Sequence, residues 1–370
     1  MQMAKLRNRK QKHLDICLDR SLPVDSGDTR LTEIKLPHRA LPETDTAGIS
    51  LSTSFLGYKL KSPLLISCMT GGSPEGNRLN RLLAEAAGKH GIAVGTGSIR
   101  VMLTHPETRS DFELKKSAGN VPVLANIGAA QLSQYPLETL VETVKSIGAD
   151  GLYVHLNPAQ ELFQEGGDCN FINWYEGIAR LTDKADFPIL VKETGGGIAP
   201  SEGLRLLNLG VSFIDVAGSG GTDWIAVEAY SRGSYENSAA ASFKNHGYTT
   251  AELLLAYRQI ARAGGRSGSL VSDSIIASGG LRTPRDFAVS LACGSHLAAA
   301  ALPFIRLASE GGIEALSEYI DEIEIGIRAA IVLGGSGSIE NFRKSELRIV
   351  PEILDNAENL AEEALKAMDR

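Results

Sequence analysis

The segment Gly151-Leu-Tyr-Val-His-Leu156 is followed at once by Asn157-Pro-Ala-Gln-Glu161. Its first part is a short apolar run of residue types that favour strands. Its second part brings two amides and a carboxylate next to the imidazole of His155. A short apolar strand that ends in polar side chains is typical of a βα unit with a functional loop. The segment therefore predicts a buried strand that leads into a ligand-binding loop.

The same pattern recurs from residue 62 onward. Short apolar runs alternate with longer segments whose apolar residues recur every three to four positions, as expected of βα units in a parallel sheet. We predict eight strands, at residues 63–67, 92–95, 122–126, 151–156, 188–192, 213–217, 274–278 and 296–301. Covering helices are expected at residues 77–90, 137–147, 201–209 and 284–292. Eight consecutive units favour an α/β fold of the closed (β/α)8 TIM-barrel type, and the alternative is an open, doubly wound sheet.

The rest of the chain is expected to surround this barrel. We predict an N-terminal extension at residues 1–61, which wraps the barrel or a neighbouring subunit, and one barrel domain at residues 62–370. An insertion at about residues 223–268 ends in a helix at 249–263, and C-terminal helices are expected at 313–333 and 352–368. Residues 1–20 are locally basic, which alone indicates a solvated helical face, and residues 23–46 are expected to be extended.

Composition restricts the function classes. The formal net charge of -7 argues against general nucleic-acid binding, which depends on a basic face, but it leaves room for a small anionic ligand. The four cysteines form no CxxC or Cys/His cluster, so neither a disulfide framework nor a zinc site is indicated. No stretch approaches the ~20 apolar residues of a membrane span, and the N-terminus lacks the apolar core of a signal peptide. We expect a cytoplasmic protein with no nucleic-acid or membrane partner.

Polar side chains and glycines follow nearly every predicted strand. Because the carboxyl ends of barrel strands meet at one face, these residues predict one shared pocket. The segments concerned are Cys68-Met-Thr-Gly-Gly72, Gly95-Thr-Gly-Ser-Ile-Arg100, Asn126-Ile-Gly128, His155 to Glu161, Lys192-Glu-Thr-Gly-Gly-Gly197, Gly218-Ser-Gly-Gly-Thr222 and Ser278-Gly-Gly-Leu-Arg282.

Two of these strand ends indicate an anionic ligand. Glycines after the sixth and seventh strands let the backbone approach a phosphate, so Thr222, Gly280 and the small run at 298–301 are candidates for its pocket. Tight turns alone are the alternative explanation of these glycines. Lys192 ends an apolar strand, where a charge needs an anionic or electron-rich partner. A structural salt bridge to Glu193 or Asp215 is the alternative there.

The loop after the fourth strand holds the densest set of functional groups, at His155, Asn157, Gln160 and Glu161. A single carboxylate is a poor protein-only metal cage, but it suits Mg²⁺ that is held mainly through substrate phosphates. The imidazole, taken alone, is more often structural than catalytic. The sequence has no Walker A, H-E-x-x-H, G-x-S-x-G or G-x-G-x-x-G pattern, so a nicotinamide cofactor would have no Rossmann domain of its own.

Taken in order, these motifs resemble the type 2 isopentenyl diphosphate isomerases, an FMN-dependent barrel family. The similarity extends along almost the whole chain. Each motif alone is weak evidence, but the full set in this order is specific to the family. The matching residues are Arg9-Lys10, His13, His38, Leu41-Pro-Glu43, Met69-Thr-Gly-Gly72, Gly97-Ser98, Arg100, Asn126-Ile-Gly-Ala129, His155-Leu-Asn157, Gln160-Glu161, Lys192-Glu193, Asp215-Val216, Gly220-Gly-Thr222, Ala277-Ser-Gly-Gly280 and Arg282.

The resemblance implies an enzyme of isoprenoid biosynthesis that interconverts isopentenyl diphosphate and dimethylallyl diphosphate. It implies reduced FMN as acid–base catalyst, Mg²⁺, and NADPH for flavin reduction. The FMN contacts that it implies are Cys68, Met69, Thr70, Ser98, Asn126, Lys192, Ala217, Thr222, Gly280, Leu281, Arg282, Ala298 and Ala299. The substrate contacts that it implies are Arg9, Lys10, His13, Ser98, Arg100, His155, Asn157 and Gln160.

Within that set, the resemblance makes Gln160 the first candidate for the second proton transfer. His155 and Asn157 would hold the diphosphate, and Glu161 would bind Mg²⁺. It also implies a homo-oligomer, a tetramer or octamer, in which Arg9 and Lys10 reach the diphosphate of a neighbouring subunit.

The chain departs from the family pattern at three positions. Ile99 stands where many relatives carry Gln, Ala217 where Ser is frequent, and His246 where Trp often precedes Gly247. We expect these changes to affect local packing and flavin affinity. Two other functions are considered: an FMN-dependent oxidoreductase on the same barrel, such as a hydroxy-acid oxidase or nucleotide dehydrogenase, and a non-enzymatic flavin- or phosphate-binding protein.

Overall fold

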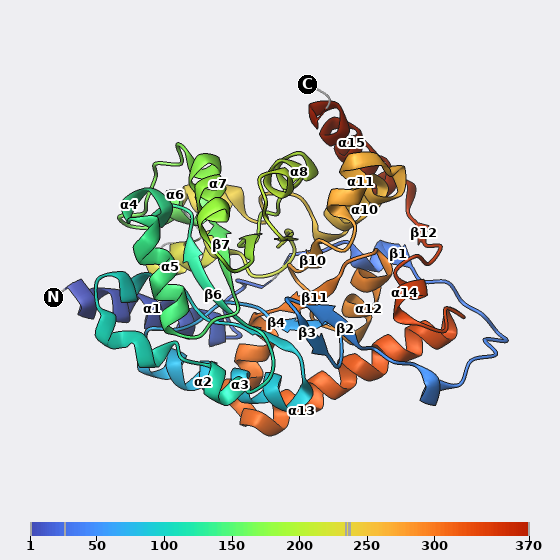
Figure 1. Ribbon diagram of the computed structural model, residues 1–370, viewed down its shortest axis with the longest axis horizontal. Helices are drawn as coiled ribbons and strands as arrows, with labels where there is room; N and C mark the ends of the chain where they lie inside the picture. Colours follow the sequence, from blue (N-terminus) through green and yellow to red (C-terminus); the bar gives the residue numbers. More distant parts are fainter. Residues whose placement is uncertain (1, 26, 234, 236–237, 369–370) are drawn as a thin grey trace.

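The computed structural model describes residues 2–25, 27–233, 235 and 238–368. Its centre is a closed barrel of eight parallel strands in the order β10-β11-β4-β5-β6-β7-β8-β9 (Figure 1). The strands are β4 (Leu64–Ile66), β5 (Ala93–Gly95), β6 (Val123–Gly128), β7 (Gly151–Leu156), β8 (Ile189–Glu193), β9 (Phe213–Asp215), β10 (Ile275–Ala277) and β11 (Leu297–Ala300). All eight predicted strands are present. The open-sheet alternative is wrong, because β11 pairs with β4 and closes the ring.

Long helices cover the outside of the barrel. They are α2 (Pro74–His90), α5 (Leu137–Ser146), α7 (Trp174–Lys184), α8 (Pro200–Asn208), α10 (Thr250–Ala263), α12 (Pro284–Ala292), α13 (Leu302–Leu333) and α15 (Pro351–Met368). The predicted helices lie within these bounds or differ by one to three residues at their ends. Helix α2 begins at Pro74 rather than at residue 77, because the Ser73 hydroxyl caps it and Pro74 suits its first turn.

Shorter elements fill the loops. The short α-helices are α3 (Lys115–Ala118), α4 (Gln131–Gln134), α6 (Pro158–Phe163), α9 (Trp224–Ser231), α11 (Gly265–Val271) and α14 (Ile339–Phe342). The 3-10 turns are η1 (Leu31–Glu33), η2 (Thr46–Gly48), η3 (Ile99–Leu103), η4 (Pro106–Asp111) and η5 (Ala239–Phe243). Strands β1 (Ile34–Lys35) and β12 (Arg348–Ile349) form a separate antiparallel pair.

Helix α13 corrects one predicted boundary. The sequence predicts a helix at 313–333, whereas the structure continues it back to Leu302, along the lower edge of Figure 1. Gly312 has φ 63° and ψ -144°, so the long helix consists of two helical segments that meet at a break. The pair Gly311-Gly312 marks that break in the sequence, and the segment before it was not predicted.

The N-terminal segment closes the amino end of the barrel. Strands β2 (Thr53–Phe55) and β3 (Tyr58–Leu60) form a hairpin that the sequence did not predict. Its Phe55 and Leu60 side chains are buried in the cluster that fills the barrel, and the Phe55 ring packs edge-on against Phe213 at 5.0 Å between centroids. Ligands therefore have access from the opposite, carboxyl end of the strands.

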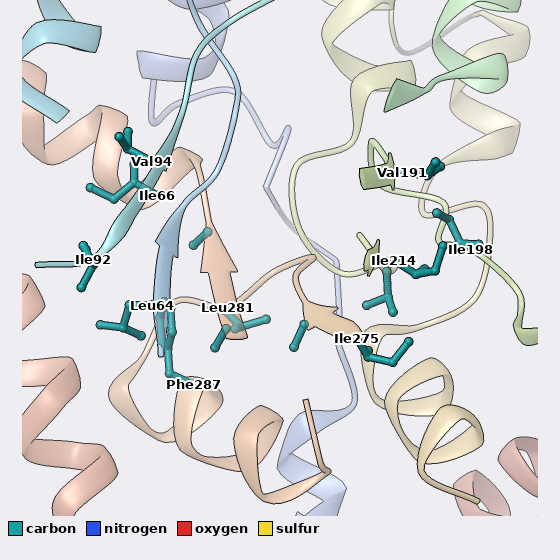
Figure 2. Close-up of a cluster of buried hydrophobic side chains, with 14 of the residues drawn as sticks. Leu64, Ile66, Ile92, Val94, Val191, Ile198, Ile214, Ile275, Leu281 and Phe287 are labelled. Atoms are coloured by element: carbon teal, nitrogen blue, oxygen red, sulfur yellow. The ribbon is translucent and has the colours of Figure 1, made fainter. Parts of the chain in front are cut away.

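A larger apolar cluster lies between the strands and the helices. Figure 2 shows part of it, with Leu64, Ile66, Val94 and Ile214 projecting from the strands toward the surrounding elements. Because successive side chains of a strand point to opposite faces, each strand contributes both to this layer and to the barrel interior. No helix in the described part of the chain is long and apolar enough to cross a membrane.

Candidate active site

Two adjoining hollows form one cleft at the carboxyl ends of the strands. Their shared walls are Cys68, Met69, Lys192, Thr194 and Trp224. Most of the predicted site residues line this cleft. The first hollow is lined by Arg9, Lys10, His13, Thr70, Ser98, Arg100, Asn126, His155, Asn157, Gln160 and Glu161, and the second by Ala217, Thr222, Gly280 and Arg282.

The loop after β7 is held by its own side chains. Pro158 occupies the first turn of α6, so the helix starts directly after the strand and carries Gln160 and Glu161 in its opening turn. The Asn157 amide donates to Gln160 Oε1 and to Glu161 Oε1, both at 3.1 Å. The sequence-predicted residues of this loop are thus brought together, and their orientations depend on one another.

Gln160 continues this chain of hydrogen bonds to residues of other elements. Its Nε2 donates to Glu228 Oε1 at 2.8 Å, and the same oxygen lies 3.2 Å from His13 Nε2. Burial raises the pKa of Glu228, but the hydrogen bond from His13, its charge and the Gln160 amide outweigh this, and the pKa lies below its usual value. Gln160 therefore lies between an amide and an ionised carboxylate.

Glu161 is buried, and both of its carboxylate oxygens accept hydrogen bonds. Oε1 accepts from Asn157, whereas Oε2 accepts from the Asp168 backbone N–H at 2.7 Å and from Gln164 Nε2 at 3.1 Å. No three His, Cys, Asp or Glu side chains in the described residues gather closely enough to hold a metal ion. A cation here would need most of its ligands from a bound substrate or from water.

The first hollow has a positive electrostatic environment. It is lined by four cations, Arg9, Lys10, Arg100 and Lys192. Among the described residues that line it, Glu161 is the only acidic one. Burial and then the charges of Arg9 and Arg100 lower the pKa of Lys10 to about 8. This crowding of cations is unfavourable without an anion, so the hollow suits an anionic ligand.

His155 shows the same effect more strongly. Burial, followed by the charges of Lys192, Lys10 and Arg100, lowers its pKa to about 3. Its Nδ1 lies 2.7 Å from Asn126 Oδ1, so the neutral ring donates through Nδ1 and leaves Nε2 as an acceptor. His155 is therefore neutral near pH 7 in this structure.

Lys192 is buried and has no carboxylate hydrogen-bond partner within the described chain. Its Nζ donates to the Glu193 backbone carbonyl at 2.6 Å. The Glu193 carboxylate instead accepts from the backbone N–H groups of residues 194–197, and Asp215 accepts from Tyr153 and Ser278. The salt-bridge alternative for Lys192 is therefore wrong. The ammonium remains available to a ligand.

The second hollow contains the predicted phosphate pocket. Gly279 and Gly280 have φ values of 99° and 75°, and their backbone N–H groups donate to no other group in the described chain. A Cβ on Gly279 would lie 2.1 Å from the Gly218 carbonyl oxygen, so the loops after β9 and β10 touch through their backbones. These glycines serve close packing and also leave donors open to an anion.

Three of the predicted flavin contacts do not line the cleft. Ala298 and Ala299 are fully buried within β11, in the outer layer and the barrel interior respectively, and the cleft is lined by Ala300 and Ala301 instead. Leu281 is also fully buried, and Figure 2 shows it among the core side chains near Phe287. Ala298 and Ala299 are buried because successive side chains of a strand point to opposite faces, here the helix-covered layer and the barrel interior.

Helix α1 (Gln2–Leu18) supplies Arg9, Lys10 and His13 to the cleft of its own chain. The resemblance implies contact with a neighbouring subunit, whereas in this structure Lys10 Nζ donates to the Ser98 carbonyl at 3.2 Å. The helix is held there by the apolar side chains of Ile16 and Cys17, which pack against α9 and α13 residues. The basic N-terminus is therefore part of the site rather than only a solvated face.

The search against protein-family models finds no matching model. Curated relatives match nearly the whole chain, and each of the following is named isopentenyl-diphosphate delta-isomerase. The protein of Chlorobaculum parvum is 39% identical over 92% of this chain and 96% of its own length. That of Borreliella afzelii is 37% identical over 91% and 92%, and that of Sulfurisphaera tokodaii is 32% identical over 95% and 94%.

The chain belongs to the isopentenyl-diphosphate delta-isomerase family. Its fold is also similar to that of flavoenzymes of distant sequence. A lactate oxidase of Pediococcus acidilactici has a TM-score of 0.65 at 14% identity, with 94% of each chain covered. The flavin-binding domain of baker's yeast flavocytochrome b2 has a TM-score of 0.65 at 16% identity, with 90% of this chain and 79% of that chain covered. These likenesses show the (β/α)8-barrel fold alone.

The three departures from the family pattern have different settings. Ile99 is fully buried in the apolar core, where an amide would need a partner. Ala217 has φ 41° and donates its N–H to Ser278 Oγ at 3.1 Å, so its unusual backbone is held by the neighbouring strand end. His246 is exposed and stacks edge-on against Phe243.

Four residues in or beside this cleft were not predicted from the sequence. Glu228 and Trp224 lie on α9, and Gln164 and Asp168 follow α6. Trp224 lines both hollows and lies edge-on to the His13 ring at 5.8 Å. Two acidic residues stand out in the sequence: Glu228 lies in an otherwise apolar helix, and Asp168 lies between a glycine and a cysteine. The sequence does not show that they contact Gln160 and Arg100.

Proposed function

We propose that this protein isomerises isopentenyl diphosphate to dimethylallyl diphosphate in isoprenoid biosynthesis, with reduced FMN and Mg²⁺. One observation carries the proposal: four cations converge on a hollow with a single carboxylate in its described wall, and one of them, Lys192, is buried without a carboxylate partner. A diphosphate would balance the charges of Arg9, Lys10 and Arg100, and an electron-rich ring would interact favourably with the Lys192 ammonium. The names of the relatives support this pairing.

The residues of the cleft fit FMN. The second hollow offers the free N–H groups of Gly279 and Gly280 together with the Thr222 hydroxyl, which suits one phosphate. The Arg282 guanidinium lines the same hollow, paired with Asp25. From there the walls continue through Met69 to Lys192, where a flavin ring would lie. We assign Cys68, Thr70, Ser98, Asn126 and Ala217 to the same ligand.

The residues around Glu161 fit Mg²⁺. The buried carboxylate is fixed by three hydrogen bonds and keeps further lone pairs, and the adjoining cations suit the remaining charge of a metal-bound diphosphate. We propose that Glu161 would hold the ion and that substrate phosphates and water would supply its other ligands. In this arrangement Arg9, Lys10, Arg100, His155 and Asn157 bind the diphosphate.

Moving the double bond requires one proton to be added at the terminal carbon and another to be removed, through a state with cationic character. When bound, reduced FMN supplies an electron-rich surface and a proton-exchanging group beside the five-carbon chain. Gln160 orients the second proton, because its amide is held between Asn157 and the ionised Glu228. Trp224 and Met69 cover the cleft and keep water from that state.

The alternative function is oxidation of a hydroxy acid by the same cofactor, favoured by the fold shared with a lactate oxidase. Such a reaction needs a histidine base beside the substrate. His155 has a pKa of about 3 and lies among cations, which makes it a weak base. Consumption of oxygen or reductant in proportion to product separates the two functions.

We propose that NADPH reduces the flavin from solution, since the sequence has no dinucleotide fingerprint. We also propose a cytoplasmic homo-oligomer, a tetramer or octamer, with residues 1–61 as an extension to a single FMN-binding barrel at 62–370. Exposed apolar side chains at Leu162, Phe243 and Tyr248 support association.

The direct test is to purify the protein and record its flavin absorbance, then assay isopentenyl diphosphate with Mg²⁺ under reducing conditions. We expect yellow protein with non-covalent FMN and the appearance of dimethylallyl diphosphate. Bound FAD, or protein that stays inactive after FMN and reductant are added, contradicts the proposal.

A further inference from the structure

Arg100 is held by a carboxylate from outside the cleft. Its Nη1 lies 3.1 Å from Asp168 Oδ2, and Arg100 lines the first hollow whereas Asp168 is absent from the described wall. The Asp168 carboxylate is itself fixed, because Gln134 Nε2 donates to Oδ1 at 3.0 Å and Gln131 Nε2 donates to Oδ2 at 3.5 Å. The ion pair therefore lies behind the guanidinium as seen from the cleft.

The backbone of the same residue reaches the other side of the site. The Asp168 N–H donates to Glu161 Oε2 at 2.7 Å. The preceding Gly167 lies against Glu161, where a Cβ would be 2.0 Å from the backbone carbonyl oxygen, so only glycine fits this approach. Asp168 is thus joined to Arg100 by its side chain and to Glu161 by its main chain.

We propose that Asp168 is a positioning residue for the diphosphate site. Its carboxylate fixes the Arg100 guanidinium so that the remaining N–H donors face the cleft, while its N–H independently orients Glu161. This inference rests on the proposed function, in which Arg100 binds the diphosphate. Arginine has five N–H donors in a rigid fork, so an ion pair between one Nη1 and Asp168 leaves enough donors for two phosphate oxygens.

Two effects of the Asp168 charge oppose each other. The carboxylate repels an incoming diphosphate through space, but it also removes the conformational freedom of a long, partly exposed side chain. The Asp168 side chain is 27% exposed, so solvent and salt screen the repulsion. We infer that positioning outweighs repulsion, and that removing the charge weakens anion binding by roughly two- to five-fold, the range typical of partly exposed ion pairs.

The test uses oxidised FMN holoenzyme and calorimetric titration with Mg²⁺-pyrophosphate, a probe that needs no turnover. We expect Asp168→Asn and Asp168→Ala to raise Kd while the flavin absorbance is retained. In an Arg100→Gln background, Asp168→Ala should add little further loss, because the partner is already absent. The Mg²⁺ concentration for half-maximal binding should stay unchanged, because the backbone N–H to Glu161 remains.

Glu113→Gln is the matched control. Glu113 pairs with Arg109 at 2.6 Å and is also 27% exposed, but it is absent from the described wall of the cleft. It should bind pyrophosphate as the wild type does. Wild-type affinity in both Asp168 variants, tighter binding, or a full additional loss in the Arg100→Gln background overturns the positioning role. A wild-type enzyme that binds pyrophosphate but performs no isomerisation refutes the proposed function alone, and one that binds no pyrophosphate refutes both.

Discussion

The ammonium of Lys10 should make catalysis sensitive to pH on the alkaline side. Its pKa is lowered to about 8, first by burial and then by Arg9 and Arg100, so in the free enzyme it is charged below pH 8 and neutral above it. A bound diphosphate raises this pKa again, because it stabilises the charged form. We expect kcat/KM to fall above about pH 8 while kcat persists to higher pH, measured as full pH profiles with the flavin reduced.

Replacement by arginine tests the assignment of that limb. Lys10→Arg should move the fall in kcat/KM to higher pH, because guanidinium stays charged throughout the range. The control is Lys12→Arg, two residues along the same helix, where the ammonium donates to the Ser231 carbonyl at an exposed position. If kcat/KM falls at the same pH in Lys10→Arg and in the wild type, the fall is due to the titration of another group.

Gln160 and Glu161 are adjacent, yet they should fail differently when altered. Glu161→Gln should raise the Mg²⁺ needed for half-maximal activity, because a neutral amide is a weaker ligand for a hard cation, and added metal should recover part of the rate. Gln160→Ala should lower kcat with little change in metal requirement, since an interaction used chiefly in the transition state affects turnover. Both are measured across a Mg²⁺ titration. Superimposable metal curves for Glu161→Gln and wild type would place the ligand elsewhere, and full activity of Gln160→Ala would remove it from the proton path.

The site residues that could be predicted from the sequence lie at strand ends, whereas the residues that were missed depend on tertiary contacts. His155 and Lys192 lie near the carboxyl ends of apolar strands, so their place in the cleft could be predicted from the barrel alone. Glu228 lies on a helix of the insertion, and only the fold brings it within 2.8 Å of Gln160. Ala298 and Ala299 were misplaced because one or two positions along β11 separate the core from the cleft, which Ala300 and Ala301 line.

At the scale of secondary-structure elements, α1 makes a prediction of its own. It attaches to the barrel through apolar side chains and through Arg306 Nε, which donates to the Cys17 carbonyl at 2.9 Å. The double variant Arg9→Ala with Lys10→Ala should therefore keep its fold and its FMN. It should weaken substrate binding by roughly tenfold or more, because each lost charged hydrogen bond contributes about 1.5–3 kcal/mol, discounted for partial exposure. Titration of substrate into holoenzyme measures this affinity. An unchanged Kd would mean that the basic side chains of α1 are only solvated and do not bind substrate.

A mixing experiment decides which cleft α1 serves. The structure gives Arg9 and Lys10 to the cleft of their own chain, so mixing the double variant with Glu161→Gln should restore no activity. Restored activity would mean that α1 crosses to a neighbouring subunit, as the family resemblance implies. Each variant measured alone at the same total concentration is the control.

Element boundaries followed from local signals where those existed. Helix α12 was predicted with both ends from its apolar residues at three-to-four spacing, and the structure adds a capping box of Thr283 and Asp286 at its N-terminus. The β2–β3 hairpin was not predicted, since its three-residue strands are stabilised by Phe55 and Leu60 inside the barrel rather than by their own pattern. The first part of α13 was missed because Gly312 interrupts its helical period.

For the whole molecule, the ring of eight βα units was the most predictable feature, because it rests on a pattern repeated along the chain rather than on any one contact. The same architecture explains how an acidic protein can present a cationic cleft. The net charge of -7 belongs to the whole chain, whereas helix α1 brings two cations, and the loop after β5 and strand β8 one each, to the carboxyl end of the barrel. Such an arrangement concentrates positive potential at the site without making the whole surface basic.

The last prediction concerns the electron balance of the whole enzyme. The proposed substrate and product are isomers, so turnover consumes no reducing equivalents, and the sequence offers no dinucleotide fingerprint for stoichiometric use of NADPH. Under anaerobic conditions, NADPH equal to the bound FMN should therefore support many turnovers. Product would be followed by nuclear magnetic resonance while NADPH is followed by absorbance, with a flavin-free sample as control. Product that stops at one equivalent of reductant would identify an oxidoreductase instead.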